Sequence, residues 1–247
     1  MRSGPVFERI LLKLSGELLQ GAAGSGLDPA AISLVAERVK EAADYGVQIG
    51  LVIGAGNLFR GLPASRDGMN RCSADSVGML ATVMNALAMR DALEAAGLPT
   101  EIQSAIAMTG IVDPFDVRRA LDHLENDRAV IFAGGTGHPF FSTDTTAALR
   151  ACQVRASAVL KATKVDGVYT ADPKTDPTAA RYRRISYGDA LKQRLSVMDS
   201  TAFSLCMDNS VPILVFDFSC PNVLRDIVRG DLSGATLVDD GPTELDV

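Results

Sequence analysis

The sequence predicts an α/β protein, a three-layer αβα sandwich around a mostly parallel central sheet. Short apolar runs of strand length alternate with longer segments in which apolar residues recur at helical spacing. Such alternation is typical of parallel strands joined by crossover helices. At 247 residues the chain suits one large domain with a sizeable core, or two poorly separated lobes that share a sheet.

The expected elements follow in a regular order. Residues 9–14 and 47–53 are predicted as strands. Between them, residues 29–45 are predicted as an amphipathic helix, because Asp28 provides an N-cap and Pro29 the first helical residue. A long helix rich in Ala and Met is expected over residues 75–96, and a polar loop over residues 171–184. The remaining predicted strands are 101–105, 129–133, 156–160, 213–216 and 235–238, and the remaining helices are 114–125, 145–153, 187–195, 201–208 and 221–229.

Composition and charge indicate a cytoplasmic protein. The net charge of −6 argues against nucleic acid or an anionic membrane as the main partner. The four cysteines are scattered without a CxxC pair, so neither a disulfide framework nor a zinc site is expected. Glu8, Arg9 and Lys13 interrupt the apolar stretch at the N-terminus, which therefore lacks the core of a signal peptide. No run approaches the roughly 18 apolar residues of a membrane helix.

Cations and small residues follow several predicted strands, where ligands bind in parallel sheets. Lys13 lies at the end of the first strand and Ser15-Gly16 follow it, and a glycine-rich loop that contains Arg60 follows the second. Accessible backbone N–H groups and cations suit phosphate oxygens. Each loop alone is weak evidence, since a glycine-rich turn is often purely structural. The chain has neither a GxxxxGK[ST] P-loop nor a GxGxxG in the Rossmann position, so a different phosphate cradle is indicated.

A further loop, over residues 134–145, adds polar groups before a predicted helix. Ser142, Thr143 and the helix N-terminus can bind a phosphate. The Phe140–Phe141 pair can flank a base, although core packing is the commoner role of such a pair. Asp144 can also serve simply as an N-cap. Lys161 then places a second lysine at a strand end.

Five motifs in this order resemble bacterial uridylate (UMP) kinases of the amino-acid-kinase superfamily. They are KLSGE (13–17), GAGNLFRG (54–61), MLATVMNALAMRDAL (79–93), GTGHPFFSTD (135–144) and LKATKVDGVYTADP (160–173). The similarity runs from about Arg9 to the C-terminus. It implies an amino-acid-kinase-like fold in one domain over residues 1–247. The N-terminal lobe, about 1–155, would be mainly the UMP side, and the C-terminal lobe, about 156–247, mainly the ATP side.

The resemblance also implies roles for individual residues. Lys13 and Lys161 match the catalytic cations, and Asp144 matches the carboxylate that orients them. The implied ATP-binding residues are Lys13, Leu14, Ser15, Gly16, Gly56, Arg60, Thr163, Tyr169 and Asp172. The implied UMP-binding residues are Ala55, Asp75, Thr136, Gly137, His138, Pro139, Phe140, Phe141, Ser142 and Thr143. A segment that responds to GTP falls on Gly21, Ala22, Ala23, Gly24, Ser25 and Gly26.

The implied reaction moves the γ-phosphoryl group of ATP to UMP, giving UDP and ADP, in pyrimidine nucleotide biosynthesis. Mg²⁺ would be bound through ATP phosphates, without a dedicated protein site. The resemblance further implies a homohexamer, with GTP as an activator and UTP as an inhibitor. Three features depart from the family pattern: Ala55 stands where a third glycine is common, His138 replaces a frequent Asn, and the segment 21–26 is small and weakly polar.

Two other functions remain open from the residues. A sister amino-acid kinase that acts on a carboxylate would share the fold and the lysines, but should lack the GTGxPFFxTD form. A non-catalytic nucleotide sensor could tolerate loss of Lys13, Lys161 or Asp144, all of which are present. Asp75 at the predicted helix start can be a helix cap as well as a ribose ligand. Selectivity for UMP over CMP or dUMP depends on backbone contacts that no motif shows.

Overall fold

A ten-stranded sheet organises the protein in this computed structural model, which describes residues 5–66, 68–195 and 197–246. The strand order is β10-β7-β9-β8-β6-β1-β2-β5-β3-β4. Neighbours pair in parallel except β10 with β7 and β8 with β9, which confirms the mostly parallel sheet. The strands are β1 Arg9–Leu14, β2 Gln48–Ile53, β3 Thr100–Ser104, β4 Asp113–Pro114, β5 Ala129–Ala133, β6 Ala158–Thr163, β7 Tyr182–Ser186, β8 Ile213–Asp217, β9 Ala235–Asp239 and β10 Glu244–Leu245.

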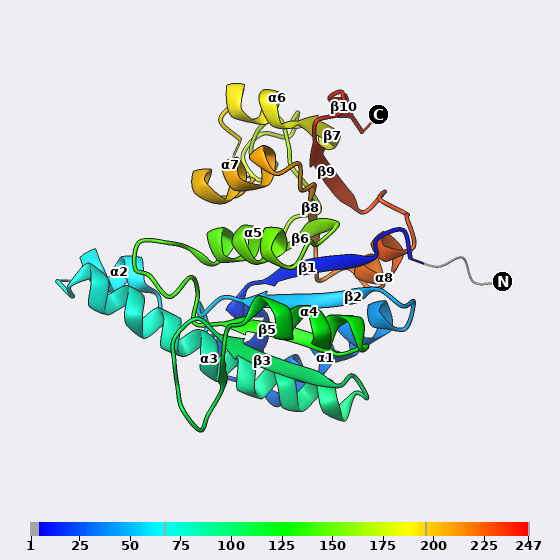
Figure 1. Cartoon of the computed structure of the whole chain (residues 1–247). Helices are drawn as coiled ribbons and strands as arrows, with labels where there is room; N and C mark the ends of the chain where they lie inside the picture. Colours follow the sequence, from blue (N-terminus) through cyan, green and yellow to red (C-terminus); the bar gives the residue numbers. More distant parts are fainter. Residues whose placement is uncertain (1–4, 67, 196, 247) are drawn as a thin grey trace.

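Helices cover both faces of the sheet, as Figure 1 shows. One core lies between the sheet and α1, α3 and α8, and a second lies between the sheet and α4, α5, α6 and α7. The helices are α1 Pro29–Ala43, α2 Gly61–Arg66, α3 Arg71–Ala95, α4 Val117–Glu125, α5 Thr143–Gln153, α6 Tyr187–Lys192, α7 Ser200–Asp208 and α8 Val223–Val228, with 3₁₀ helices η1 Gly16–Leu19 and η2 Gly21–Ala23. The three-layer αβα prediction is therefore confirmed.

The alternation of side chains along β1 decides which face its lysine occupies. Leu12 and Leu14 belong to the core under α1 and α3, whereas Leu11 belongs to the core under α5. Because successive side chains of a strand point to opposite faces, Lys13 lies on the same face as Leu11. In β6, Val159 packs in the core under α5, and Lys161 shares its parity. Both lysines are thus directed to the face that α5 covers.

Several element boundaries differ from those expected. The long helix begins at Arg71, after an Asn70 N-cap, so Asp75 lies one turn inside it and the helix-cap interpretation of Asp75 is wrong. The short helix α2 precedes it, where no element was predicted. Residues 171–184, expected as a loop, contain the start of β7, which pairs with β9 and β10. Strand β7 pairs with strands more than fifty residues later in the chain, and such a pairing cannot be recognised from the sequence around β7 alone.

Helix α3 has the length and hydropathy of a membrane span, a property that no apolar run had suggested. The core helix of a soluble protein passes the same test. Here α3 packs with Val83, Met89 and Leu93 in the core against the sheet and α1. Packing inside the domain therefore accounts for part of its apolar composition, since 39% of the apolar window is buried.

Candidate active site

Two lysines share one carboxylate at the carboxyl ends of β1 and β6. Lys13 Nζ lies 2.9 Å from Asp144 Oδ1, and Lys161 Nζ donates to Asp144 Oδ2 at 2.8 Å. The side chains of all three are at most 16% exposed. The predicted catalytic residues therefore do lie together. One anion between two cations leaves one positive charge in excess, which suits a negatively charged reacting group.

The charge of Asp144 follows from its neighbours. Burial by itself raises the pKa of this carboxyl, but the ammonium groups of Lys13 and Lys161 outweigh burial, so that the pKa lies below its ordinary value. Asp144 is thus ionised at neutral pH. It lies in the first turn of α5, where the helix dipole also favours negative charge. The simple N-cap interpretation is wrong, because the N-cap of α5 is Ser142.

Asp199, which the sequence did not single out, joins α5 to α7 behind the lysine–carboxylate cluster. It caps α7 by accepting from the backbone N–H groups of Thr201 and Ala202 at 3.0 Å. It also accepts from the hydroxyls of Ser142 and Thr145 in α5. The backbone of the preceding loop takes part as well, since Lys161 donates to the carbonyl of Val197 at 2.7 Å. The position of Asp144 thus depends on a segment more than fifty residues later in the chain.

The glycine-rich loops approach each other too closely for side chains. A Cβ at Gly16 would lie 2.3 Å from the carbonyl oxygen of Gly54, so only glycine fits there. Two buried amides brace this contact: Asn57 and Asn85 hydrogen-bond each other, and Asn85 donates to the carbonyl of Gly54 at 2.7 Å. Ser15 caps η1 by accepting from the N–H of Glu17. The predicted phosphate cradle is therefore preorganised.

The loop predicted to wrap UMP is anchored to the long helix. Asp75 accepts from the N–H of Phe140 at 2.8 Å and pairs with Arg71 at the same distance. Phe140 has φ +71°, a conformation that a bulky residue adopts at a cost. Its ring is 63% exposed and lies under the Arg71 guanidinium, while Phe141 is 49% exposed. Neither ring is buried in the core, so the commoner interpretation of this pair is wrong.

Four more residues of the implied UMP set, Thr136, Gly137, His138 and Pro139, lie in the same loop, while Ser142 and Thr143 begin α5 and Ala55 follows β2. The hydroxyl of Thr136 accepts from the N–H of His138 at 3.3 Å. Next to Thr136 and His138, a cavity of about 610 Å³ runs between α5, α7 and the segment before α4. Arg150 lies in its wall. The Arg150 guanidinium is buried over the ring of Phe115, and burial lowers the pKa of Arg150 to about 10.

Three residues of the implied ATP set, Thr163, Tyr169 and Asp172, lie at the end of β6 and in the segment after it. Thr163 donates to the carbonyl of Val165, and Tyr169 donates to Asp166 at 2.7 Å. Burial, together with this neighbouring carboxylate, raises the pKa of the Tyr169 hydroxyl. Asp172 closes a turn by accepting from the N–H of Lys174. Arg60, from the loop after β2, pairs with Glu17.

The predicted effector segment, residues 21–26, is an exposed turn that contacts the glycine-rich loop. The N–H of Gly26 donates to the carbonyl of Asn57, and the Asn57 amide donates to the carbonyl of Gly26. Gly21, Gly24 and Gly26 all have positive φ, which glycine adopts without strain. The segment is thus physically joined to the loop between the predicted nucleotide sites.

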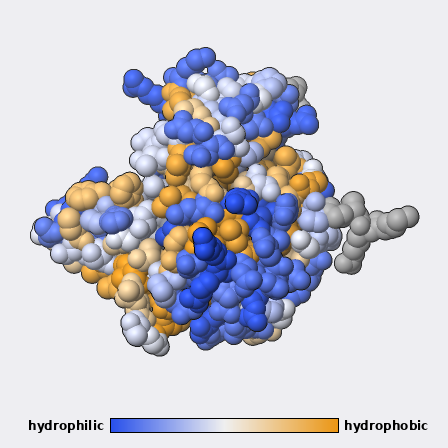
Figure 2. Space-filling model, viewed as in Figure 1, coloured by the Kyte–Doolittle hydropathy of each residue, from blue (hydrophilic) through white to orange (hydrophobic). Residues whose placement is uncertain are grey.

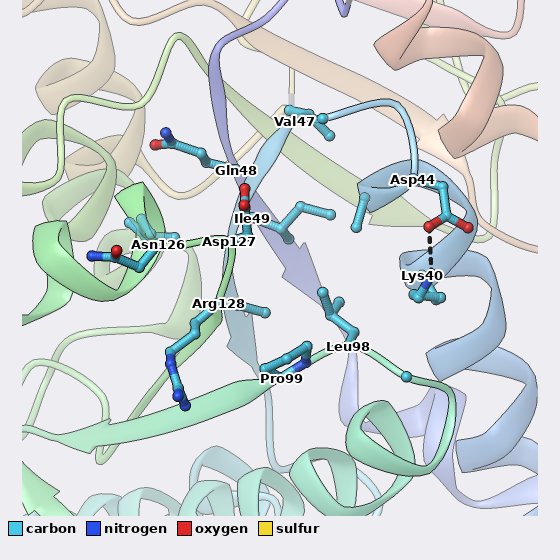
Figure 3. A pocket seen from close by; sticks show the side chains of 15 residues that line it. Lys40, Asp44, Val47, Gln48, Ile49, Leu98, Pro99, Asn126, Asp127 and Arg128 are labelled. Atoms are coloured by element: carbon cyan, nitrogen blue, oxygen red, sulfur yellow. Dashed lines mark hydrogen bonds and ion pairs between the residues drawn. The ribbon is translucent and has the colours of Figure 1, made fainter.

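A second cavity, of about 370 Å³, lies at the opposite edge of the sheet and has no part in this site. Figure 3 shows its walls, which include Gln48 at the start of β2, Pro99 before β3 and the paired Lys40 and Asp44 of α1. These residues stand at the amino ends of the parallel strands. The lysine–carboxylate cluster stands at the carboxyl ends.

No group of three or more His, Cys, Asp or Glu side chains that could hold a metal ion occurs within residues 5–66, 68–195 and 197–246. The acidic groups nearest the predicted phosphates are already engaged by cations, Asp144 by two lysines and Glu17 by Arg60 and Lys164. These residues fit an Mg²⁺ ion whose ligands come mainly from nucleotide phosphates and water.

Sequence reasoning found the lysines and their carboxylate but missed the groups that hold them. Asn85 is the only amide side chain in α3. Because a buried amide needs a hydrogen-bond partner, its presence among apolar residues could have indicated a polar contact with a neighbouring loop. Glu17 was visible in the KLSGE motif but was given no role. Asp199 has the local signature of an N-cap, and nothing in the sequence connects it to α5.

Comparison with known proteins decides the family. The model of the amino acid kinase family matches residues 8–217. The chain belongs to this family, in its uridylate kinase branch. It is 53% identical to a uridylate kinase of Legionella pneumophila (strain Paris), with 92% of each chain covered, and 51% identical to one of Ectopseudomonas mendocina (strain ymp), with 96% of each covered.

Solved structures agree with this membership. The chain matches UMP kinase from Bacillus anthracis with a TM-score of 0.93 and 35% identity, covering 98% of this chain and 99% of the other. It matches UMP kinase from Ureaplasma parvum with a TM-score of 0.89 and 36% identity, covering 97% and 100%. The membership expected from the five motifs is confirmed, and with it a nucleoside-monophosphate kinase activity.

Proposed function

We propose that this protein is an ATP:UMP phosphotransferase that makes UDP and ADP for pyrimidine nucleotide synthesis. The observation that carries the proposal is the cluster of Lys13, Asp144 and Lys161 at the carboxyl edge of the sheet. Its surplus positive charge lies between the two loop systems expected to hold the nucleotides. The relatives that cover nearly the whole chain are uridylate kinases.

The reaction requires that ATP and UMP be aligned and that the negative charge of the transferring phosphoryl group be neutralised. A phosphate oxygen of UMP attacks the γ-phosphorus of ATP, a new P–O bond forms, and the bond to the β-phosphate oxygen breaks, leaving ADP. That oxygen is already anionic, so no general base is required. Lys13 and Lys161 stabilise the negative charge on the transferring group, and Asp144 keeps the two ammonium groups in place. The N–H groups of the glycine-rich loops contribute fixed donors.

Mg²⁺, bound through ATP phosphates, would supply further charge neutralisation on the leaving group. The residues around it orient the substrates. Ser15 and Gly16 form the floor of the proposed ATP-phosphate site together with Gly56 and Arg60, and Thr163, Tyr169 and Asp172 line the adenosine side. The residues before about 155 form mainly the UMP side and those after it mainly the ATP side.

On the acceptor side, Asp75 is proposed to bind the ribose while holding the Phe140 N–H. The loop from Thr136 to Thr143 then encloses the nucleotide. His138 offers an imidazole where the family often has an amide, and Ala55, which is buried, adds a methyl group where glycine is common. Both are compatible with nucleotide binding, since each leaves the backbone donors in place.

A coupled assay of ADP production with ATP-Mg²⁺ tests the proposal against its rivals. The acceptors are UMP, CMP, dUMP, AMP, glutamate and acetylglutamate. Turnover with UMP alone supports the proposal, and turnover with an amino acid identifies a sister kinase instead. Folded protein that binds ATP but transfers to no acceptor would be a nucleotide sensor.

Self-association is proposed through α3. Its exposed apolar residues Val77, Leu80 and Met84, with Met69 before the helix, form an exposed apolar face. Figure 2 shows hydrophobic side chains along the α3 side of the molecule. Exposed apolar surface of this kind is typical of an interface between chains. We propose a homohexamer in the cytoplasm, activated by GTP through residues 21–26 and inhibited by UTP.

A further inference from the structure

Glu17 holds one cation from each side of the predicted phosphate site. Arg60 Nη2 pairs with Glu17 Oε1, and Lys164 Nζ donates to Glu17 Oε2 at 2.6 Å. Glu17 follows β1, Arg60 follows β2 and Lys164 follows β6. Since β6, β1 and β2 are neighbours in the sheet, one carboxylate links the loops beyond three adjacent strands.

The exposed fractions of the three side chains show which of them a ligand in solvent can contact. The side chains of Lys164 and Arg60 are 72% and 60% exposed, whereas that of Glu17 is 22% exposed. The carboxylate therefore lies behind its two cations, beside Gly56. The hydrogen bond from Lys164 lowers the pKa of Glu17, more than partial burial raises it, so Glu17 is ionised at neutral pH. Two cations against one anion leave one positive charge in excess.

We propose that Glu17 is an internal stand-in for phosphate. In the empty protein it holds Arg60 and Lys164 together, and the polyphosphate of a nucleotide takes both cations from it. Lys164 is then a phosphate-binding residue, and Glu17 is a positioning residue whose competition leaves inorganic polyphosphate with weak binding. The inference rests on the proposed function, because it takes the loop of Ser15 and Gly16 to be the cradle of a nucleoside triphosphate.

The weak binding of inorganic polyphosphate follows from competition between anions. Carboxylate and phosphate oxygens accept from the same charged donors, so an arriving ligand must replace two ion pairs. Inorganic polyphosphate gains only its phosphate contacts in return. A nucleotide also gains the contacts of its base and ribose, which outweigh the loss of the Glu17 pairs. Glu17 therefore lowers both affinities by a similar factor, and only the nucleotide keeps enough other contacts to bind well.

The test measures binding of inorganic tripolyphosphate, and of a non-hydrolysable ATP analogue with Mg²⁺, by isothermal titration calorimetry at fixed ionic strength. Glu17→Gln should bind tripolyphosphate ~3- to 10-fold more tightly, as expected when two exposed ion pairs no longer compete. The gain for the ATP analogue should be similar in size, because ATP displaces the same two ion pairs. Lys164→Met should weaken tripolyphosphate binding by ~3- to 10-fold. In the double variant the gain from Glu17→Gln should shrink, because one of its two cations is gone.

Two control variants separate this effect from a change in overall charge. Glu101→Gln removes a carboxylate from an exposed pair with Arg128, and Lys192→Met removes an exposed lysine of α6. Both should leave tripolyphosphate affinity nearly unchanged. In steady-state kinetics, Lys164→Met should raise KM for ATP more than it lowers kcat. A residue that only supported the fold would change the melting temperature instead.

The inference is overturned if Glu17→Gln weakens tripolyphosphate binding or leaves it unchanged in a protein with normal melting temperature. It is also overturned if no variant binds tripolyphosphate. The binding and melting measurements do not involve a phosphoryl acceptor such as UMP. Failure of the wild type to phosphorylate UMP would therefore overturn the proposed function alone, while normal UMP turnover with unchanged tripolyphosphate affinities would overturn this inference alone.

Discussion

Lys13 and Lys161 lie directly opposite one another in the register of the parallel strands β1 and β6. Ammonium groups so placed repel each other, and the repulsion is relieved by Asp144, which contacts one lysine through each carboxylate oxygen. One positive charge remains in excess beside Asp144, and a second anion bound there would neutralise it. A transferring phosphoryl group is such an anion. The register of β1 with β6 thus places the two lysines on either side of the proposed transferring phosphoryl group.

Replacing Lys13 by alanine should lower kcat by at least ~100-fold, by analogy with the loss of one charge-stabilising donor in other active sites. The fold should persist, since Lys13 contributes to neither hydrophobic core. Coupled ADP production with UMP as the acceptor gives the measurement. Lys40→Ala, in an exposed pair at the opposite edge of the sheet, is the control. A fall of less than about threefold for Lys13→Ala would contradict the catalytic assignment.

Asp144→Asn should lower stability by about 2–3 kcal/mol at neutral pH, somewhat less than breaking a fully buried ion pair. The pKa of Asp144 lies below its ordinary 3.8 when the protein is folded. Its ionised form therefore stabilises the fold above the unfolded-state pKa, and this contribution is lost as pH falls through the lower, folded-state pKa. Urea unfolding should show a constant difference between wild type and variant from about pH 7 to 5, shrinking below about pH 4. A difference that shrinks as pH rises from 5 to 7 would mean that the pKa is raised.

The fold class could be predicted from local patterns, and the catalytic cluster because Lys13, Asp144 and Lys161 match residues of a known family. Strand–helix alternation implies a parallel sheet, and residues at the carboxyl ends of its strands converge without further information. The approach of Asp199 to Ser142 could not be predicted in this way, because it depends on how α5 packs against α7. The first turn of α3 was missed because Cys72 is the only apolar residue from Arg71 to Ser73, and strand β7 because it begins in a proline-containing polar stretch.

Asp199→Ala should reduce both stability and activity. Loss of the α7 N-cap alone costs about 1 kcal/mol. The variant also frees Ser142, and small displacements of catalytic groups lower kcat by roughly 10- to 100-fold. Asp116→Ala is the matched control, because Asp116 caps α4 through the N–H of Arg119 and, among the residues that the structure describes, makes no hydrogen bond to α5. Thermal melting and kcat are measured for both. Equal loss of stability with equal, small effects on kcat would show that Asp199 is only a cap.

Phe140→Gly tests whether the Phe140 ring contacts UMP or has no role in binding. The ring is mostly exposed, so little apolar burial is lost, and glycine relieves the cost of a positive φ, about 1–2 kcal/mol. The cation–π contact with Arg71 and the added freedom of the unfolded chain offset this gain. Stability should therefore change by less than about 1 kcal/mol. KM for UMP should rise while KM for ATP stays the same, and a rise in both would place the ring outside the acceptor site.

Charged substitutions on α3 should dissociate the proposed assembly. Leu80 and Met84 are 47% and 54% exposed in the single chain and lie four residues apart, on one face of the helix. Leu80→Lys with Met84→Lys would bury two unpaired ammonium groups in an interface on this face, which is strongly unfavourable. Light scattering coupled to size-exclusion chromatography should show a smaller species than the wild type. Leu191→Lys, at an equally exposed leucine of α6, should keep the wild-type mass. An unchanged mass for the double variant would exclude this face of α3 from the interface and direct the search to another surface.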